Sequence, residues 1–383
     1  MGYSTNPYLS LDDDTNSAFG RVFVEGRHSR ATELTVIGLS AYAEHTVYSG
    51  GNNSNQLASL NGSVRHRASA NVDVFGLLGA TINSGGQLSS RFIDFPVGPV
   101  ATPQAPVGGG TPPPPPVTPA PAPIVLGPNF VTDPTFIGFR GNQYSVRGLV
   151  GASFKVNARD SISVQAGTQH FLFEGDAGQD YTTYSLGAGW DRVLSERTVI
   201  GAGVDASFVN YEDGGDSAFY SPNFRVRTSL AENWVASAAV GASIVNSDDD
   251  DDDDRSIGLY LTGSLCRSVL ESSFCGSVQR SAAPSSNGVI VTATNAGVSY
   301  NRRLTVNDSI QASANYVRYS GDDIFDNTVT SFGSADVGYN KRLSGRLWST
   351  AQVGARVADR REGESATDVN ASLSVRYRFG DTM

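Results

Sequence analysis

The stretch from Ala366 to Phe379 alternates strictly between two chemical classes. Its apolar members are Val369, Ala371, Leu373, Val375, Tyr377 and Phe379, and its polar members are Asp368, Asn370, Ser372, Ser374, Arg376 and Arg378. Successive side chains of a β-strand point to opposite faces, so this stretch predicts a strand with one apolar and one polar wall. A single strand of this kind fits a soluble sandwich as well as a membrane barrel, and the other strands must distinguish the two.

The same period of two recurs along the chain and predicts an all-β protein of about eighteen antiparallel strands, with sixteen as the alternative. The expected strands are 1–10, 18–28, 34–48, 56–67, 70–83, 142–156, 161–173, 181–193, 198–211, 218–229, 234–246, 256–267, 273–282, 289–302, 309–319, 330–341, 347–358 and 366–379. The first of them has the weakest pattern. An even number of strands places both chain ends on the same side of a barrel.

The breaks between these strands are of two kinds that alternate. The short breaks are 192–197, 228–233, 303–308 and 342–347, and the longer, acidic or glycine-rich breaks are 50–55, 174–180, 212–217, 248–254, 283–288, 322–328 and 360–365. Outer-membrane barrels have short periplasmic turns and long external loops, whereas a soluble sandwich has no reason to separate its loops in this way. The acidic runs are interpreted as solvated loops rather than as a calcium site.

Charged residues recur on the polar face of strand after strand. A dry core would leave many of these charges buried and unpaired, so the pattern predicts a water-filled lumen. Two interpretations stay open: the charges pair across strands and brace the wall, or an excess of basic groups favours anionic solutes. The residues predicted to line the lumen are Arg65, Arg67, Arg147, Lys155, Arg225, Arg227, Arg356, Arg376, Arg378, Asp73, Asp205, Asp336 and Asp368.

Composition agrees with a barrel and excludes other classes. Apolar residues make up 39% of the chain, and no run approaches the roughly 18 consecutive apolar residues that a transmembrane helix needs. The net charge of −10 argues against nucleic acid as a partner, because phosphate binding requires a basic face. The chain begins without a basic or apolar leader, so an exported protein of this sequence would be a mature form with an added initiator methionine.

Residues 85–140 interrupt the alternation. Of the 17 prolines in the chain, most lie between Pro96 and Pro134, and proline cannot donate to a β-ladder. The segment is therefore predicted to be a long external loop inserted into a single barrel domain that spans residues 1–383. The alternative is that its apolar ends, 92–97 and 130–139, fold into the mouth of the barrel and constrict it.

Two further side-chain sets are placed by the strand pattern. Cys266 and Cys275 lie symmetrically about a turn at Leu270 and Glu271, which makes them cross-strand neighbours, either bonded or a pair of small buried thiols. Aromatic residues near the strand ends are predicted to form the two interfacial girdles of a barrel. They are Tyr48, Phe171, Phe173, Tyr211, Tyr300, Tyr316, Tyr339, Tyr377 and Phe379.

No catalytic or metal-binding pattern stands out. The four histidines, which are His28, His45, His66 and His170, are scattered over different strands. The sequence has no HExxH motif and no GxSxG nucleophile elbow. We therefore expect a protein that is not an enzyme and that carries no cofactor or metal.

Two short motifs carry a family resemblance. The run of Val375, Tyr377 and Phe379 at alternating positions resembles the C-terminal signal by which the barrel assembly machinery recognises bacterial outer-membrane proteins. Residues 2–8, GYSTNPY, resemble the first strand of the type 2 β-barrel porin family, some of whose members are encoded with exopolysaccharide export systems. The resemblance implies a barrel in the outer membrane of a Gram-negative bacterium, in contact with lipid and lipopolysaccharide.

These observations predict an outer-membrane channel for the passive diffusion of small hydrophilic solutes. One alternative is a barrel component of an exopolysaccharide secretion or surface-assembly system, and another is a structural or adhesive protein with a plugged lumen. Expected partners are outer-membrane lipid, lipopolysaccharide, the assembly machinery, and either further copies of the chain or a secretion partner.

Overall fold

The structure is a computed structural model that describes residues 1–7, 9, 16–49, 54–84, 141–174, 178–212, 215–249, 252–321, 329–360 and 364–377. No helix within these ranges is long and apolar enough to cross a membrane. The strands are β1 (Gly2–Ser4), β2 (Ser17–Ala31), β3 (Thr35–Tyr48), β4 (Ser54–Ser69), β5 (Val72–Ser84), β6 (Asn142–Lys155), β7 (Asp160–Glu174), β8 (Tyr181–Ser195), β9 (Thr198–Tyr211), β10 (Ser217–Ala231), β11 (Trp234–Asp249), β12 (Asp252–Val269), β13 (Ser272–Pro284), β14 (Ile290–Arg303), β15 (Asp308–Ser320), β16 (Val329–Arg342), β17 (Leu347–Arg360) and β18 (Ser365–Tyr377).

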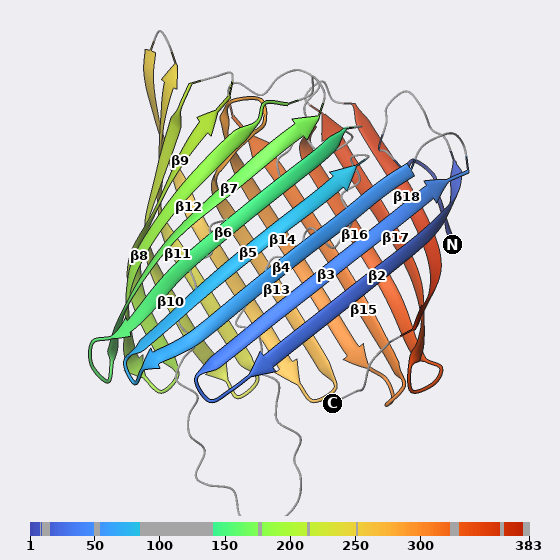
Figure 1. Ribbon diagram of the computed structural model, residues 1–383, viewed down its shortest axis with the longest axis horizontal. Coiled ribbons are helices and arrows are strands. Elements are labelled where there is room, and N and C mark those ends of the chain that lie inside the picture. Colours follow the sequence, from blue (N-terminus) through green and yellow to red (C-terminus); the bar gives the residue numbers. More distant parts are fainter. Residues whose placement is uncertain are drawn as a thin grey trace, which may run out of the picture.

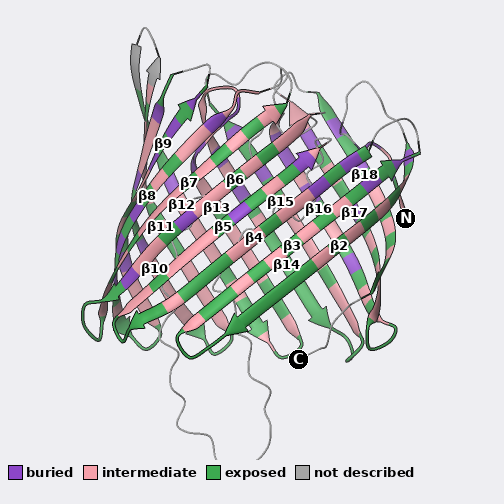
Figure 2. Ribbon diagram, in the orientation of Figure 1, coloured by how far each residue is buried: buried purple, intermediate pink, exposed green. Residues whose placement is uncertain are grey.

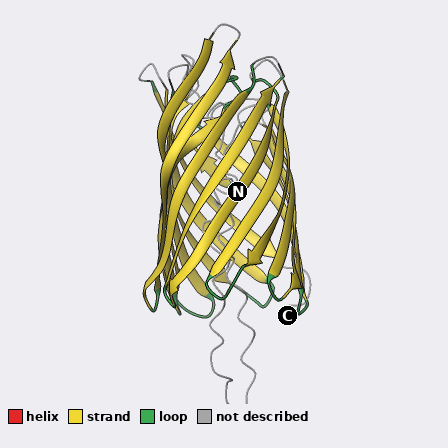
Figure 3. Cartoon of the chain, turned by 90° about the vertical axis from the view of Figure 1, so that its left-hand side faces the viewer, coloured by secondary structure: helices red, strands yellow, loops and turns green. Residues whose placement is uncertain are grey.

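The strands form one closed antiparallel barrel. Each strand from β2 to β18 pairs with its neighbours in chain order, and β1 pairs with β18 on one side and with β2 on the other. The strands tilt around an elongated cylinder (Figures 1 and 3). The predicted fold class is confirmed, including the count of eighteen strands in the described part of the chain.

The first strand is much shorter than predicted. A strand over residues 1–10 was expected, whereas β1 comprises three residues and pairs through Gly2 to Ser372 and through Ser4 to Asn370. It therefore starts part-way along the wall rather than at the end of the barrel where β18 stops. The ladder stops where the Asn6 backbone N–H donates to the Asp368 carboxylate instead of to a strand. Pro7 follows and has no N–H to offer.

The connections alternate as predicted with one exception. The acidic break expected at 248–254 is part of a hairpin, because β11 runs to Asp249, β12 starts at Asp252 and the two strands stay paired up to these residues. Turns at the end where β18 stops are short, for example Leu270 and Glu271 between β12 and β13, and the long connections gather at the opposite end. We call these the short-turn end and the long-loop end. β5 ends and β6 begins at the long-loop end. The proline-rich segment 85–140 between them, predicted to be an external loop, lies outside the described residues, as do Arg378, Phe379 and the side chains of 248–254.

The outer wall is apolar and the inner wall is largely polar. Val22, Leu78 and Val150 point outward and keep 72%, 70% and 63% of their surface exposed. Exposed positions recur along the strands (Figure 2). So much exposed apolar side chain around a closed barrel is the lipid-facing surface of a membrane protein. The chain is a transmembrane barrel of the bacterial outer-membrane type.

The prediction for the aromatic residues was half wrong. Tyr300, Tyr316, Tyr339 and Tyr377 point outward and are exposed, as an interfacial girdle requires. The other four described members point into the barrel, where they pack or are buried, because they share the parity of the inward polar positions of their strands. These four are Tyr48, Phe171, Phe173 and Tyr211. Position near a strand end does not determine which face a side chain occupies.

Cys266 on β12 and Cys275 on β13 are directly opposite each other in the ladder. A disulfide joins them, with their Cα atoms 4.1 Å apart. Of the two states that the sequence left open, the structure has the bonded one.

The assignment of faces can be tested with two neighbours in the middle of β17. Val353 points outward, whereas Gln352 points into the barrel and donates to Asp336. We expect Val353→Arg to lower the free energy of unfolding by about 2–4 kcal/mol, because it places a charge in hydrocarbon. Gln352→Arg is the matched control and should cost much less. Urea titrations in lipid vesicles measure both, and equal costs would contradict the assignment.

Candidate functional site

The predicted lumen residues lie where the sequence placed them. Each one that the structure describes occupies an inward-facing position, and Arg378 falls outside the described residues. The structure does not gather them into one site. They form separate groups along the wall, which differ in burial and in their partners.

The most buried group lies on β8 to β10. Arg225 donates from Nε and Nη2 to the two carboxylate oxygens of Asp191 at 2.7 Å and 2.9 Å. The Arg225 side chain is only 3% exposed. Close by, Asn223 donates to Asp205 at 3.3 Å. Paired charges of this kind brace a wall, because a bidentate pair fixes the relative position of two strands.

Glycines make room for this pair. A Cβ at Gly189 or Gly201 would collide with the Arg225 guanidinium. The alternating glycines of β8 and β9 are thus explained by the side chain that lies across them. Asp191, the partner of Arg225, was not among the predicted residues, although it shares the inward parity of Gly187 and Gly189 on β8.

A second group closes the barrel. Asp368 on β18 is completely buried. Its carboxylate accepts bonds from Arg356 Nε at 3.0 Å and Nη2 at 2.6 Å, from Ser4 Oγ at 2.6 Å and from the Asn6 backbone N–H at 3.0 Å. One carboxylate therefore joins β17, β18 and the N-terminal segment.

The group at the short-turn end is open to water. Arg65 and Arg67 approach Asp73 at 3.7 Å and 3.8 Å, and their side chains are 47% and 56% exposed although they point into the barrel. Arg376 pairs with Glu25 at the junction of β18 and β2. Other inward cations have different surroundings: Arg147 donates to Asn61, and Lys155 and Arg227 form no ion pair with a described residue.

The inner wall turns apolar towards the long-loop end. One cluster packs around Phe332 on β16 and includes Leu9, Ala283, Val291, Ala293, Val317, Tyr319, Ala358 and Ala366. A second cluster centres on β8 and β9, around Tyr181, Val209 and Tyr211, with Phe171, Phe173, Phe219 and Ile290 packed against it. No prediction from sequence anticipated either cluster.

Residues 285–289, between β13 and β14, cross from one cluster to the other. Val289 packs against the first cluster and Ile290 against the second. The Ser286 carbonyl accepts the backbone N–H of Gln179 at 2.7 Å, and the Tyr211 hydroxyl donates to the Val289 carbonyl at 3.3 Å. Ser285 and Ser286 are buried. We call residues 285–289 the crossing loop, because it follows β13 in the chain and yet contacts the connection between β7 and β8 through Gln179 and the end of β9 through Tyr211.

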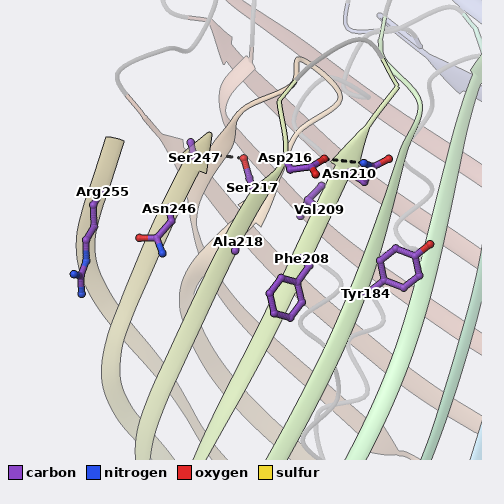
Figure 4. Close-up of a pocket in the computed structure, with 10 residues that line it drawn as sticks. All are labelled: Tyr184, Phe208, Val209, Asn210, Asp216, Ser217, Ala218, Asn246, Ser247 and Arg255. Atoms are coloured by element: carbon purple, nitrogen blue, oxygen red, sulfur yellow. Dashed lines mark hydrogen bonds between the residues drawn. The ribbon is translucent and has the colours of Figure 1, made fainter. Parts of the chain in front are cut away.

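A groove of about 970 Å³ lies at the long-loop end of β8 to β12. Tyr184, Phe208 and Arg255 reach it from the outward face of the wall (Figure 4). It therefore borders lipid and lies off any path through the lumen. Within the described part of the chain, no group of three or more His, Cys, Asp or Glu side chains could hold a metal ion.

No family model matches the sequence, and no curated protein matches it. Solved structures that align with it include the FrpB iron transporter of Neisseria meningitidis (F5-1 variant), with a TM-score of 0.49, 10% identity and 99% of this chain covered against 66% of that one. The apoprotein form of that transporter aligns with a TM-score of 0.47 and 9% identity, over 94% of this chain and 60% of that one.

The alcaligin outer-membrane receptor FauA of Bordetella pertussis aligns with a TM-score of 0.42 and 9% identity, over 99% of this chain and 65% of that one. The chain thus spans about two thirds or less of the length of these three proteins. Similarity at this level says nothing of what the chain transports or binds.

The role of Asp368 in closure gives a stability prediction. Asp368→Asn removes the charge that Arg356 and the N-terminal segment share, and we expect the free energy of unfolding to fall by about 3–5 kcal/mol. Asp336→Asn is the control, because Asp336 accepts hydrogen bonds from Ser313 and Gln352 without an ion pair to a described residue. It should cost about 1 kcal/mol. Equal losses in denaturant titrations would show that Asp368 has no special role in closure.

Proposed function

We propose that the chain is an outer-membrane channel for the passive diffusion of small hydrophilic solutes and that it has no catalytic activity. The observation that carries the proposal is the half-exposed state of Arg65 and Arg67, whose side chains point into the barrel. Side chains that face inward and remain this exposed leave the short-turn end of the lumen accessible to water, which supports a wet lumen. A wet, charged inner wall suits ions and polar solutes.

The crossing loop and the two apolar clusters make the long-loop end the narrow part of this pathway. A hydrophobic constriction opposes the passage of water and ions. We therefore propose that the resting conductance is small and that the crossing loop sets it.

The selectivity of the proposed channel depends on few residues. Arg225 and Arg356 are neutralised by Asp191 and Asp368 and act as braces. Arg227 and Lys155 have no ion pair among the described residues, and both lie near the short-turn end of the inner wall. An unpaired cation in a lumen favours anions, so these two are the proposed selectivity residues.

A second candidate function is a barrel component of exopolysaccharide secretion, in keeping with the resemblance to the type 2 β-barrel porin family. The inward aromatic residues Phe171 and Phe173 favour it, because they are only partly buried and an aromatic ring offers an apolar face on which a sugar ring can stack. Block of the conductance by a neutral oligosaccharide would support this candidate over a general diffusion channel.

The proposal also covers how the barrel reaches its membrane. Val375 and Tyr377 lie on the outward face of β18, next to the junction with β1. An assembly machinery that binds the last strand would find these side chains accessible. Phe379, the third residue of the proposed signal, lies outside the described residues.

Planar-bilayer recordings test the channel and the crossing loop together. We expect a small but stable conductance from the wild-type protein. Replacing residues 285–289 by Asn-Gly, a two-residue hairpin turn, should increase the conductance because it removes the bridge between the two apolar clusters. Tyr300→Phe, which removes a hydroxyl on the outward face, is the control and should change nothing. A barrel that stays silent in both the wild-type and the shortened form would contradict the channel.

Selectivity is tested by Arg227→Glu, which changes the inner wall by two charges near the short-turn end. We expect the reversal potential in a salt gradient to move towards that of a cation-selective pore. Arg302→Glu makes the same change on the outward face of β14 and should leave the potential unaltered. An unchanged potential in Arg227→Glu would remove Arg227 from the selectivity residues.

A further inference from the structure

Two arginines lie on the lipid-facing wall in a single registered row. Arg280 on β13 pairs with Thr294 on β14, and Thr294 pairs with Arg318 on β15. All three side chains point outward, because they share the parity of Val278 and Tyr316, which are exposed on the outer wall. The row crosses three adjacent strands and holds two positive charges.

The height of the row is set by the ends of its strands. Arg280 comes shortly before β13 ends at Pro284, and Arg318 shortly before β15 ends at Ser320, both at the long-loop end. An outward arginine is costly at the middle of a bilayer and nearly free at its interface. Tyr316 lies one outward position closer to the midplane than Arg318, where an interfacial aromatic is expected. The row therefore lies at the level of the outer-leaflet headgroups.

None of the three side chains in the row is a carboxylate that could neutralise the two arginines. Arg280 donates from Nη1 to Thr294 Oγ1 at 3.0 Å, and neither arginine forms an ion pair with a described residue. The next acid in the same registered row is Asp359, which accepts a hydrogen bond from Ser331 at 2.7 Å. Two strand spacings separate the arginines, which is about 10 Å at the level of the backbone.

We propose that the row of Arg280, Thr294 and Arg318 binds the phosphate groups of a bisphosphorylated lipid headgroup in the outer leaflet, a lipid of the lipopolysaccharide type. Arginine suits phosphate because its planar guanidinium donates two parallel hydrogen bonds to two oxygens. Thr294 lies between the arginines and offers a hydroxyl to the same headgroup. The spacing lets each arginine hold one phosphate.

The surroundings favour a lipid over a free anion. Val278 and Tyr316 occupy the next registered row towards the midplane on the same outward wall, both opposite Ala296 of β14. Acyl chains attached to the headgroup would lie along these side chains and bury apolar surface. A free phosphate would gain none of that burial and would meet the arginines on an open, flat wall.

The proposal is tested by native mass spectrometry of the detergent-purified barrel with lipid A carrying both phosphates. We expect bound lipid on the wild-type protein and about a tenfold weaker affinity for each arginine changed to Gln, reaching roughly a hundredfold in Arg280→Gln/Arg318→Gln. Arg302→Gln is the matched control, since Arg302 is an outward arginine of β14 at the short-turn end. It should bind as the wild type does.

Other lipids and salts separate the alternatives. Lipid A without phosphates should bind weakly to all variants, and added salt should weaken the wild-type complex. Equal affinity of the double variant and the wild type would overturn the proposal, as would equal binding of the phosphate-free lipid. Displacement of the lipid by millimolar inorganic phosphate would overturn the choice of a lipid as occupant. These outcomes do not depend on whether the lumen conducts.

Discussion

Closure of the sheet is the constraint on which the rest of the structure depends. In hydrocarbon every backbone N–H and C=O must find a partner, so a sheet that spans a membrane has to join its first strand to its last. Here that joint has only three residue pairs on each side of β1. Asp368 compensates by binding Ser4, the Asn6 backbone and Arg356 at one buried carboxylate. The chain then leaves the wall and places Leu9 in an apolar cluster.

Pairing of charges across strands explains how so polar an inner wall can be stable. Asp191 and Asp368 each hold one arginine with two hydrogen bonds, and small residues such as Gly189 leave space for the guanidinium. A buried arginine without such a partner would be strongly destabilising. The same pairing removes these arginines from contact with solute. In the proposed channel, the cations left to act on a solute are those without a carboxylate, foremost Arg227.

The period of two predicted most of the fold, because side-chain parity is a local property of a strand. It placed Leu373 on lipid and Arg356 in the lumen, and it indicated the number of strands. The period of two did not predict contacts between segments that are distant in the sequence. The approach of Ser286 to Gln179 depends on the curvature of the closed barrel, which no local pattern encodes. Phe171 was misassigned for a related reason, since an aromatic near a strand end was taken to face the interface although its parity pointed inward.

The inner wall changes from exposed charges at the short-turn end to packed apolar groups at the long-loop end, and in the proposed channel this gradient would place the barrier at the long-loop end. In the proposed channel, a solute that enters at the short-turn end meets Arg65 and Arg67 before it meets the crossing loop. In the described structure the crossing loop is tied to Gln179 and Tyr211 by hydrogen bonds, and the adjoining Ile290 packs against the cluster around Tyr181. None of these contacts belongs to a strand ladder. The strand pairs that close the barrel therefore do not depend on these contacts.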